Sequence, residues 1–377
     1  MKTIIKKIFT NIIYLLDLIT PKNKSIIVFF QSNNRFNDNA KILFEYMLKN
    51  TNYQVYWLYE NIKHKEANFI KRYSLQGLIL FLKSKYCFNT HGLGDFGIYR
   101  KNIKKTIQLW HGTPIKMIGQ YDKKIHYKEL VRIKKESECY DLFIVGSEIE
   151  QHFISSSMFL KKNICLISGL PRNDYLLSGS HKRNDFLDSF KNKKIILYAP
   201  TFRDFKETKL FPFKDFDIIN ITEFLIEKNS TLLVRPHPSD KDNFELVKKL
   251  SIESKGLLQL ASNEEVQDTN DLLPFVDVVI TDYSSIYIDL LLKDIPPIFI
   301  PYDLEDYEKV RGLAYDYELV TPGPKVFTQK EFEGAIDDAL NGAEQYKEQR
   351  KFVKRMFHKY DDGQACKRII EAMEKLV

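Results

Sequence analysis

Cysteine is scarce in this sequence of 377 residues, and no apolar run is long enough to cross a bilayer. The four cysteines lie far apart, without a C-x-x-C pair or a histidine at zinc-binding spacing, so they predict reduced thiols. The first apolar run is interrupted by Asn11 and Asp17, lacks a small-residue cleavage site and is shorter than the ~20 residues of a membrane span. We therefore expect neither a disulfide framework nor a signal peptide.

Several motifs of common enzyme classes are also missing. The chain has no G-x-x-x-x-G-K-[ST] loop, no G-x-G-x-x-G after the first predicted strand, no H-E-x-x-H and no G-x-S-x-G. Its aspartates lack metal-ligand spacing. These absences disfavour an ATPase, a dehydrogenase, a zinc protease and an α/β-hydrolase. We predict no cofactor and assign no metal ligands, and the sequence leaves open a metal held by residues distant in the chain.

Charge is unevenly distributed along the chain. Residues 1–180 carry 28 lysines and arginines against 14 aspartates and glutamates, a net charge of +14, whereas residues 181–377 carry 29 against 36, a net charge of −7. The basic half favours an anionic partner: nucleic acid, anionic lipid or a phosphorylated substrate. A solvated basic face without a partner is the alternative. No aromatic-plus-basic motif accompanies the charge, so we expect no nucleic acid.

The first 20 residues predict an amphipathic helix that Pro21 should end. Ile5, Ile8, Ile12, Leu16 and Ile19 recur at spacings of three and four, and lysines flank them. Such a helix can lie at an anionic membrane surface or pack on the protein's own core, and the sequence leaves both open.

Strand and helix patterns alternate along the whole chain, which predicts parallel sheets covered by helices. The length favours two domains, and the polar stretch after residue 174 suggests a junction there. We predict an α/β fold of two doubly wound, Rossmann-like domains facing a cleft. Their boundaries are placed at 1–176 and 177–377, with the terminal helix free to pack back on the first.

Polar residues follow several predicted strands. His111 stands in Trp110-His111-Gly112-Thr113-Pro114, and prolines bracket His237 in Arg235-Pro236-His237-Pro238. Thr281-Asp282-Tyr283-Ser284-Ser285 enters a helix and offers hydroxyls to an anion. Arg172 and Arg203 also lie in loops just beyond strands, and Arg311 stands next to Gly312 beyond any obvious element. Together these loops predict a pocket for a polyanion such as a diphosphate, although rigid turns and helix caps would explain each motif singly.

Seven motifs, in order, resemble the CDP-glycerol glycerophosphotransferase family of teichoic acid synthesis. They are Trp110 to Lys116, Gly169 to Asp174, Tyr198 to Arg203, Arg235 to Pro238, Thr281 to Ser285, Arg311-Gly312 and Asp361 to Gly363. The resemblance implies a GT-B type fold. It also implies transfer of glycerol phosphate from CDP-glycerol to a hydroxyl of an undecaprenyl-diphosphate-linked saccharide or polymer, with release of CMP at the cytoplasmic face of the membrane.

The same resemblance suggests roles for individual residues. His111 would be the general base for the acceptor hydroxyl, and His237 would assist the departure of CMP. The donor diphosphate would be held by Arg311, Ser284 and Ser285, with Arg172 and Arg203 as further candidates. The other predicted substrate-binding residues are Arg235, Asp282, Thr113 and Lys116.

One departure from the family pattern concerns the donor. Leu313 and Ala314 follow Arg311-Gly312 where aromatic residues are expected, so CDP-ribitol is an alternative donor. Further alternatives are a GT-B glycosyltransferase that uses a nucleotide sugar, and a non-catalytic membrane or nucleic-acid binding protein.

Overall fold

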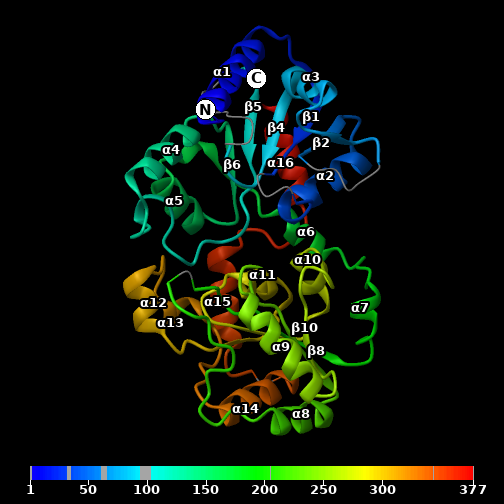
Figure 1. Cartoon of the computed structure of the whole chain (residues 1–377), viewed down its shortest axis with the longest axis vertical. Coiled ribbons are helices and arrows are strands. Elements are labelled where there is room, and N and C mark those ends of the chain that lie inside the picture. Colours follow the sequence, from blue (N-terminus) through cyan, green and yellow to red (C-terminus); the bar gives the residue numbers. More distant parts are fainter. Residues whose placement is uncertain are drawn as a thin grey trace. The chain divides into compact units, whose positions relative to one another are not determined.

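The computed structural model describes residues 2–31, 35–60, 66–93, 103–203, 205–342 and 344–376, with side chains from residue 11 onwards. Contacts divide the chain into two compact units (Figure 1). Unit 1 holds residues 1–112, 118–175 and 359–377, and unit 2 holds 113–117 and 176–358. Each unit is an α/β structure around one parallel sheet, which confirms the fold class predicted from the alternating pattern.

The sheet of unit 1 has seven described strands in the order β3-β2-β1-β4-β5-β6-β7. Every described pairing is parallel, for example Ile27 of β1 with Val55 of β2 and Tyr86 of β4. The strands are β1 (Asn23–Phe29), β2 (Gln54–Tyr59), β3 (Phe69–Lys71), β4 (Ser84–Asn89), β5 (Lys105–Gln108), β6 (Leu142–Val145) and β7 (Cys165–Ile167). The three-residue β3 is too short to show a period.

Helices cover both faces of this sheet. They are α1 (Lys2–Ile19), α2 (Asp38–Asn50), α3 (Leu75–Lys83), α4 (Tyr127–Ser137), α5 (Glu148–Ser157), α6 (Pro171–Leu177) and α16 (Ala365–Glu374), with short 3₁₀ turns at Gly119–Tyr121 and Lys162–Ile164. Ile27 and Phe29 of β1 join one core cluster with α2 and α16, while Val28 joins another with α3 and α5. Alternate residues of a strand point to opposite faces, so a strand buried on both faces is apolar throughout.

Unit 2 repeats the design with a five-stranded parallel sheet in the order β10-β9-β8-β11-β12. Its strands are β8 (Lys194–Tyr198), β9 (Ser230–Val234), β10 (Leu258–Leu260), β11 (Val278–Thr281) and β12 (Pro297–Phe299). The strand order reverses beside β8, and loops at the carboxyl ends of neighbouring strands line the binding crevice in folds of this kind.

The helices of unit 2 include three that pack on one face of its sheet: α8 (Ile218–Glu227), α9 (Lys241–Glu253) and α14 (Gln329–Leu340). The others are α7 (Asp185–Asp188), α10 (Thr269–Leu272), α11 (Ile286–Leu290), α12 (Leu304–Val310), α13 (Tyr317–Val320) and α15 (Lys347–Phe357), with 3₁₀ turns at Leu273–Phe275 and Leu291–Lys293.

The predicted N-terminal helix exists and ends at Ile19, two residues before Pro21. Its buried side differs from the predicted one: Ile13 packs into the core of unit 1, and Asp17 is buried against Lys22 and Lys104 at 2.6 and 3.1 Å. Ile12, Leu15, Leu16 and Ile19 are exposed. The side chains of Ile5 and Ile8 lie outside the described residues. The helix therefore packs on its own unit with one side and presents an apolar stripe with another.

Candidate functional site

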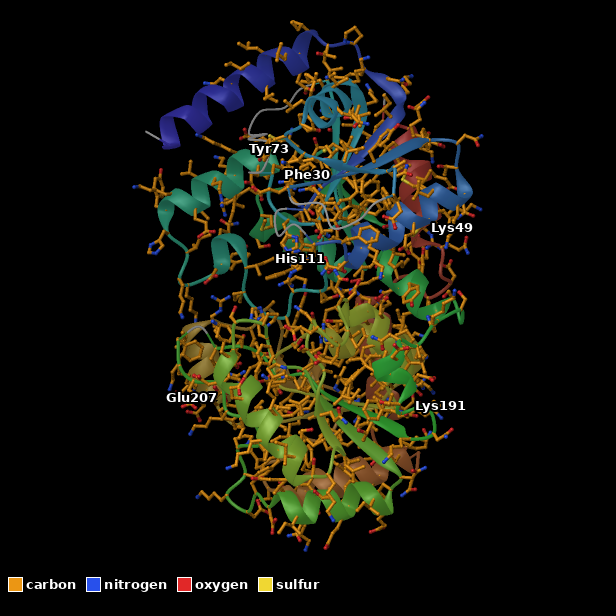
Figure 2. The ribbon with its side chains drawn as sticks, turned by 45° about the vertical axis from the view of Figure 1, so that its right-hand side comes forward. Phe30, Lys49, Tyr73, His111, Lys191 and Glu207 are labelled. Carbon is orange, nitrogen blue, oxygen red and sulfur yellow. The ribbon has the colours of Figure 1, made fainter. Side chains whose placement is uncertain are left out.

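The bend that presents His111 follows β5 directly (Figure 2). Trp110 adopts a φ of 55°, which few residues other than glycine favour, and the side chain of Gln108 accepts a hydrogen bond from the Trp110 N–H at 3.0 Å. Asn39, fully buried on α2, donates from Nδ2 to the carbonyls of Leu109 and Trp110, both at 3.1 Å. Two buried side-chain amides thus fix a backbone path that the sheet alone would not give.

Arg172 supports the same bend from α6. Its Nη1 donates to the carbonyl of His111 at 3.0 Å and to Asp38 at 3.3 Å, and its N–H donates to Asn39 Oδ1. Gly112 has a φ of 129°, and a Cβ built there would lie 2.7 Å from Arg172 Nη2. Glycine is therefore required for the guanidinium to approach the backbone. The structure gives Arg172 a role in positioning His111, because its side chain is 9% exposed and already bonded.

The hydrogen bonds of His111 define its tautomer. Its Nδ1 lies 2.9 Å from the carbonyl of Thr90, and because a carbonyl only accepts, Nδ1 carries the proton. In the neutral ring Nε2 is then an acceptor. The side chain is reached by solvent, and the protein packed around it lowers the pKa of His111, an effect opposed by the bond to Thr90. His111 is thus a neutral ring at pH 7 with a basic nitrogen to offer.

His237 of unit 2 has the opposite arrangement. It follows β9, is exposed, and stacks on Phe202 with ring centroids 5.2 Å apart. Its Nδ1 accepts a hydrogen bond from the Ser239 N–H at 3.2 Å, so the neutral ring carries its proton on Nε2. The two histidines therefore have complementary roles available: Nε2 of His111 can accept a proton, and Nε2 of His237 can donate a hydrogen bond.

The loop after β11 places Ser284 and Ser285 at the start of α11. Both residues are half-buried, and Ser285 makes no capping hydrogen bond through its side chain. Tyr283 fixes the loop, because its ring stacks on Tyr307 at 4.0 Å and its hydroxyl donates to Asp303 at 3.0 Å. The hydroxyls of the serines are held on a rigid aromatic base.

Arg203 and Asp282, both predicted to bind substrate, form part of that base. Arg203 is fully buried and donates to Asp282 Oδ2 at 2.5 Å and to both oxygens of Asp303 at 2.8 and 3.2 Å. The other oxygen of Asp282 accepts from the N–H of Thr201 at 2.8 Å. These contacts engage both side chains with protein and position the loops after β8, β11 and β12. Their part in substrate binding stays a prediction.

The side chain of Arg235 is also engaged with protein. Its Nε donates to Thr269 Oγ1 at 3.0 Å, and its two Nη atoms donate to acceptors of Ala261, Ser262, Asn263 and Val266 at 2.6 to 3.2 Å. A guanidinium has five N–H groups, and five acceptors are already in place. Arg235 therefore fastens the loop after β10, and its part in substrate binding stays a prediction.

The segment Thr113–Met117 leaves unit 1 and belongs to unit 2. It pairs with the residues that follow Arg311: Lys116 bridges Leu313, the Met117 N–H donates to the Gly312 carbonyl at 3.1 Å, and the Ala314 N–H donates to the Ile115 carbonyl at 2.7 Å. Thr113 is buried, whereas Lys116 and Arg311 are half-buried. Two motifs nearly 200 residues apart thus bring Lys116 and Arg311 to one small ladder.

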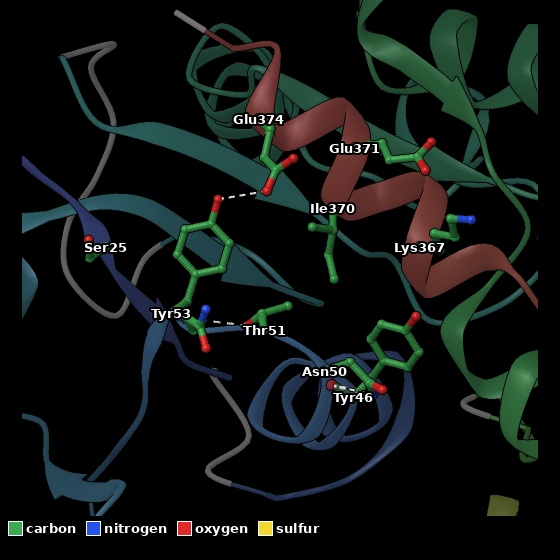
Figure 3. A pocket seen from close by; sticks show the side chains of 10 residues that line it. Ser25, Tyr46, Asn50, Thr51, Tyr53, Lys367, Ile370, Glu371 and Glu374 are labelled. Atoms are coloured by element: carbon green, nitrogen blue, oxygen red, sulfur yellow. Dashed lines mark hydrogen bonds between the residues drawn. The ribbon is translucent and has the colours of Figure 1, made fainter.

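A surface pocket of about 520 Å³ lies elsewhere on unit 1 (Figure 3). It is lined by the end of α2, the start of β2 and α16, and within it the Tyr53 hydroxyl donates to Glu374 at 2.8 Å. Ser25 and Tyr53 lie at the amino ends of their strands, whereas His111 follows the carboxyl end of β5. The pocket is therefore at the opposite edge of the sheet and contains none of the predicted site residues.

The described residues contain no group of three or more histidines, cysteines or carboxylates placed to hold a metal ion. All four cysteines are buried and free.

Comparison with known proteins identifies the family of this chain. The model of the family described as CDP-Glycerol:Poly(glycerophosphate) glycerophosphotransferase matches residues 12–375. The chain belongs to this family. The resemblance seen in the seven motifs is thereby confirmed, and with it the prediction of a transferase of the glycerophosphotransferase type.

Individual relatives extend the comparison. A teichoic acid glycerol-phosphate transferase of Staphylococcus aureus is 28% identical, with 99% of this chain and 100% of that protein covered. The teichoic acid ribitol-phosphate polymerase TarL of the same species is also 28% identical, over 72% of this chain and 48% of its own length. The structure of the wall teichoic acid polymerase TagF aligns with a TM-score of 0.79 at 23% identity, covering 99% of this chain and 95% of that one. This likeness confirms the GT-B type fold.

Asn39, Gln108 and Asp38 were missed in the sequence. Asn39 falls at the start of α2, where asparagine signals a helix start, so its amide did not suggest a contact with residues 70 positions away. Gln108 reads as the end of a strand. The contacts of Gln108 with the loops after β4 and β5 become apparent only because these two strands are neighbours in the sheet.

Asn39→Ala is expected to lower the free energy of unfolding by about 1–3 kcal/mol, because the buried carbonyls of Leu109 and Trp110 and the N–H of Arg172 lose their partner. Urea unfolding measures the change. Asn50→Ala is the matched control, since Asn50 is exposed at the other end of α2 and bonds only within its helix among the described contacts. Equal midpoints for the two variants would show that Asn39 does not hold the bend.

Proposed function

We propose that this protein transfers glycerol phosphate from CDP-glycerol to a hydroxyl of an undecaprenyl-diphosphate-linked saccharide or polyol-phosphate chain, in the synthesis of teichoic acid or a related cell-surface polymer. Family membership supports the chemistry. The observation that carries the assignment of the base is the bond between His111 Nδ1 and the Thr90 carbonyl, which leaves Nε2 unprotonated and able to accept a proton.

The proposed reaction is a displacement at the phosphorus that bears glycerol. The acceptor oxygen forms a bond to this phosphorus, and the bond to the bridging oxygen breaks, so that CMP leaves with the electron pair. His111 Nε2 takes the proton of the attacking hydroxyl. Nε2–H of His237 donates a hydrogen bond to the diphosphate and steadies the charge that develops on CMP. No covalent intermediate with the protein is needed.

Four residues of unit 2 are proposed to hold the donor diphosphate: Arg311, Lys116, Ser284 and Ser285. The two cationic residues flank the ladder between 115–117 and 312–314, and the serine hydroxyls stand on the aromatic base formed with Tyr283. Arginine and hydroxyl donors suit phosphate oxygens. Because Thr113 is buried, we assign it to the shape of this loop rather than to the substrate.

The alternative donor is CDP-ribitol. Leu313 and Ala314 take part in the ladder with 115 and 116, so aliphatic rather than aromatic side chains follow Arg311-Gly312 in this chain. A glycerol-phosphate transferase matches over the whole chain, which favours the smaller polyol. Measuring CMP release from CDP-glycerol and from CDP-ribitol, with UDP- and GDP-sugars as further donors, decides between these activities. Transfer from a nucleotide sugar alone would refute the proposal.

Peripheral attachment to an anionic membrane at its cytoplasmic face is the second part of the proposal. In the described part of the chain, no helix is both long and apolar enough to cross a membrane. The stripe of Ile12, Leu15, Leu16 and Ile19 on α1 is between 39% and 77% exposed, and α1 is anchored through the buried Asp17. An apolar helix face on a basic unit suits the boundary between lipid headgroups and acyl chains.

Replacing Leu15 and Ile19 by glutamate is expected to weaken binding to phosphatidylglycerol vesicles at least about tenfold, because each apolar side chain is worth ~1.5 kcal/mol or more when buried in lipid. Vesicle sedimentation gives the bound fraction. Ile252→Glu, at an equally exposed isoleucine of α9 in unit 2, should bind like the unmodified chain. If the double variant also bound unchanged, α1 would not be the anchor.

A further inference from the structure

A second histidine lies against His111. His91 follows β4, the neighbour of β5 in the sheet, and its ring stacks on that of His111 with centroids 4.8 Å apart and an interplanar angle of 9°. The contact was not foreseen, because His91 belongs to none of the seven motifs. Parallel rings at this distance are in the range of offset stacking.

The loops that carry the two rings are also tied to each other. The carbonyl of Thr90 accepts the hydrogen bond from His111 Nδ1 at 2.9 Å, and the hydroxyl of the same threonine lies 2.9 Å from His91 Nδ1. Gln108 joins the backbones: its Nε2 donates to the His91 carbonyl at 2.8 Å, while its Oε1 accepts from Trp110. The His91 ring is thus built into the same rigid frame as His111.

Burial, with a smaller contribution from nearby charges, disfavours the protonated form of His91. Burial, followed by the charge of His111, lowers the pKa of His91 to about 4, with Arg35 adding to the effect and Asp38 opposing it. Asp38 and Arg172 also face His111, where the carboxylate favours and the guanidinium disfavours a protonated ring. At pH 7 the ring of His91 therefore supports His111 without adding a positive charge beside the site of proton transfer.

We propose that His91 is a positioning residue for the general base: its ring packs on one face of His111 and keeps Nε2 oriented to accept the proton of the acceptor hydroxyl. This inference rests on the proposed function of His111. The required property is a flat ring in contact with His111, not a nitrogen that reaches the substrate. It follows that an aromatic ring without nitrogen should replace His91, whereas a small side chain should not.

The test compares His91→Phe with His91→Ala in the full-length chain, using CDP-glycerol and a lipid-linked acceptor. His91→Ala is expected to lower kcat by about 10- to 100-fold with the KM for CDP-glycerol unchanged, since a small misplacement of a reacting group is enough for such a loss. The acid limb of the pH–rate profile should move to higher pH, because removing the ring that packs on His111 relieves part of the burial that lowers its pKa. His91→Phe should keep most of kcat, and the acid limb of its pH–rate profile should stay at the pH seen for the unmodified chain.

NMR of the His111 ring nitrogens gives a readout that does not depend on turnover. The Nδ1–H tautomer and the lowered pKa should persist in His91→Phe and weaken in His91→Ala. An unchanged kcat and an unchanged His111 titration in His91→Ala would overturn the proposal. It would also be overturned if His91→Phe lost as much activity as His91→Ala with a raised KM for the acceptor, since His91 would then contact the substrate.

His111→Ala separates this inference from the function on which it rests. If His111→Ala is inactive and His91→Ala is normal, only the role of His91 is wrong. If His111→Ala retains turnover, the assignment of the base fails, and the role of His91 fails with it.

Discussion

His111→Ala is expected to lower the rate of glycerol phosphate transfer by about 10²- to 10⁴-fold, the usual contribution of a general base. The acceptor hydroxyl loses its proton as it attacks phosphorus, and Nε2 of His111 is the nitrogen whose tautomer leaves it free to take that proton. CMP release in the presence of a lipid-linked acceptor measures the effect. In the pH–rate profile of the unmodified chain, the acid limb should lie below about pH 6.5. The reason is that the pKa of His111 is lowered and the base works only when unprotonated.

The control for this experiment is His152→Ala. His152 is an exposed histidine of α5 in the same unit, with its Nδ1 bonded to the Glu148 carbonyl, so it tests the loss of a histidine without loss of the proposed base. It should retain full activity. Near-normal transfer by His111→Ala in a folded chain would contradict the assignment.

Arg203→Leu is expected to destabilise the protein by about 3–5 kcal/mol, because it leaves the carboxylates of Asp282 and Asp303 buried without their cation. Burial alone would raise the pKa of Asp303, but the hydrogen bonds and charge of Arg203 hold it below its ordinary value. That stabilisation is present above the unfolded-state pKa of an aspartate and is lost as the pH falls through the lower folded-state pKa. As the pH is lowered, the stability of Arg203→Leu should therefore fall less than that of the unmodified chain.

Arg132→Leu is the matched control. Arg132 pairs with Glu129 within α4, both side chains are about half exposed, and loss of such a pair costs roughly 0.5 kcal/mol. Urea unfolding of the two variants at neutral pH compares the buried and the surface arginine. If Arg203→Leu unfolded at the midpoint of Arg132→Leu, the ion pairs of Arg203 with Asp282 and Asp303 would not stabilise the fold.

Sequence periodicity predicted the architecture well because the strands are buried on both faces or end in turn residues. Apolar runs such as Ile195–Tyr198 leave few alternatives to a central parallel strand. The histidines were found for a related reason: both stand where a strand breaks at glycine or proline. What the pattern could not give is whether a polar side chain faces substrate or protein. Arg203 and Arg235 occupy the expected loops, yet both are bonded to their own unit.

Sequence patterns could not identify the residues that support His111, for a different reason. Asn39, His91 and Arg172 lie far apart in the chain, and they meet only because α2, β4 and α6 all end or begin at one edge of the sheet. Similarly, nothing in residues 113–117 signals that they leave unit 1 and pair with 312–314. These contacts depend on the order of strands, which local propensity does not specify.

Mass analysis of the product tests the central claim most directly. The full-length chain is incubated with CDP-glycerol and a synthetic undecaprenyl-diphosphate-linked disaccharide, alongside reactions with CDP-ribitol and with UDP-sugars. We predict an acceptor enlarged by one or more glycerol phosphate units, with one CMP released for each, and no such product from His111→Ala. A product enlarged by a sugar, or no product from CDP-glycerol while CDP-ribitol is used, would contradict the proposed activity.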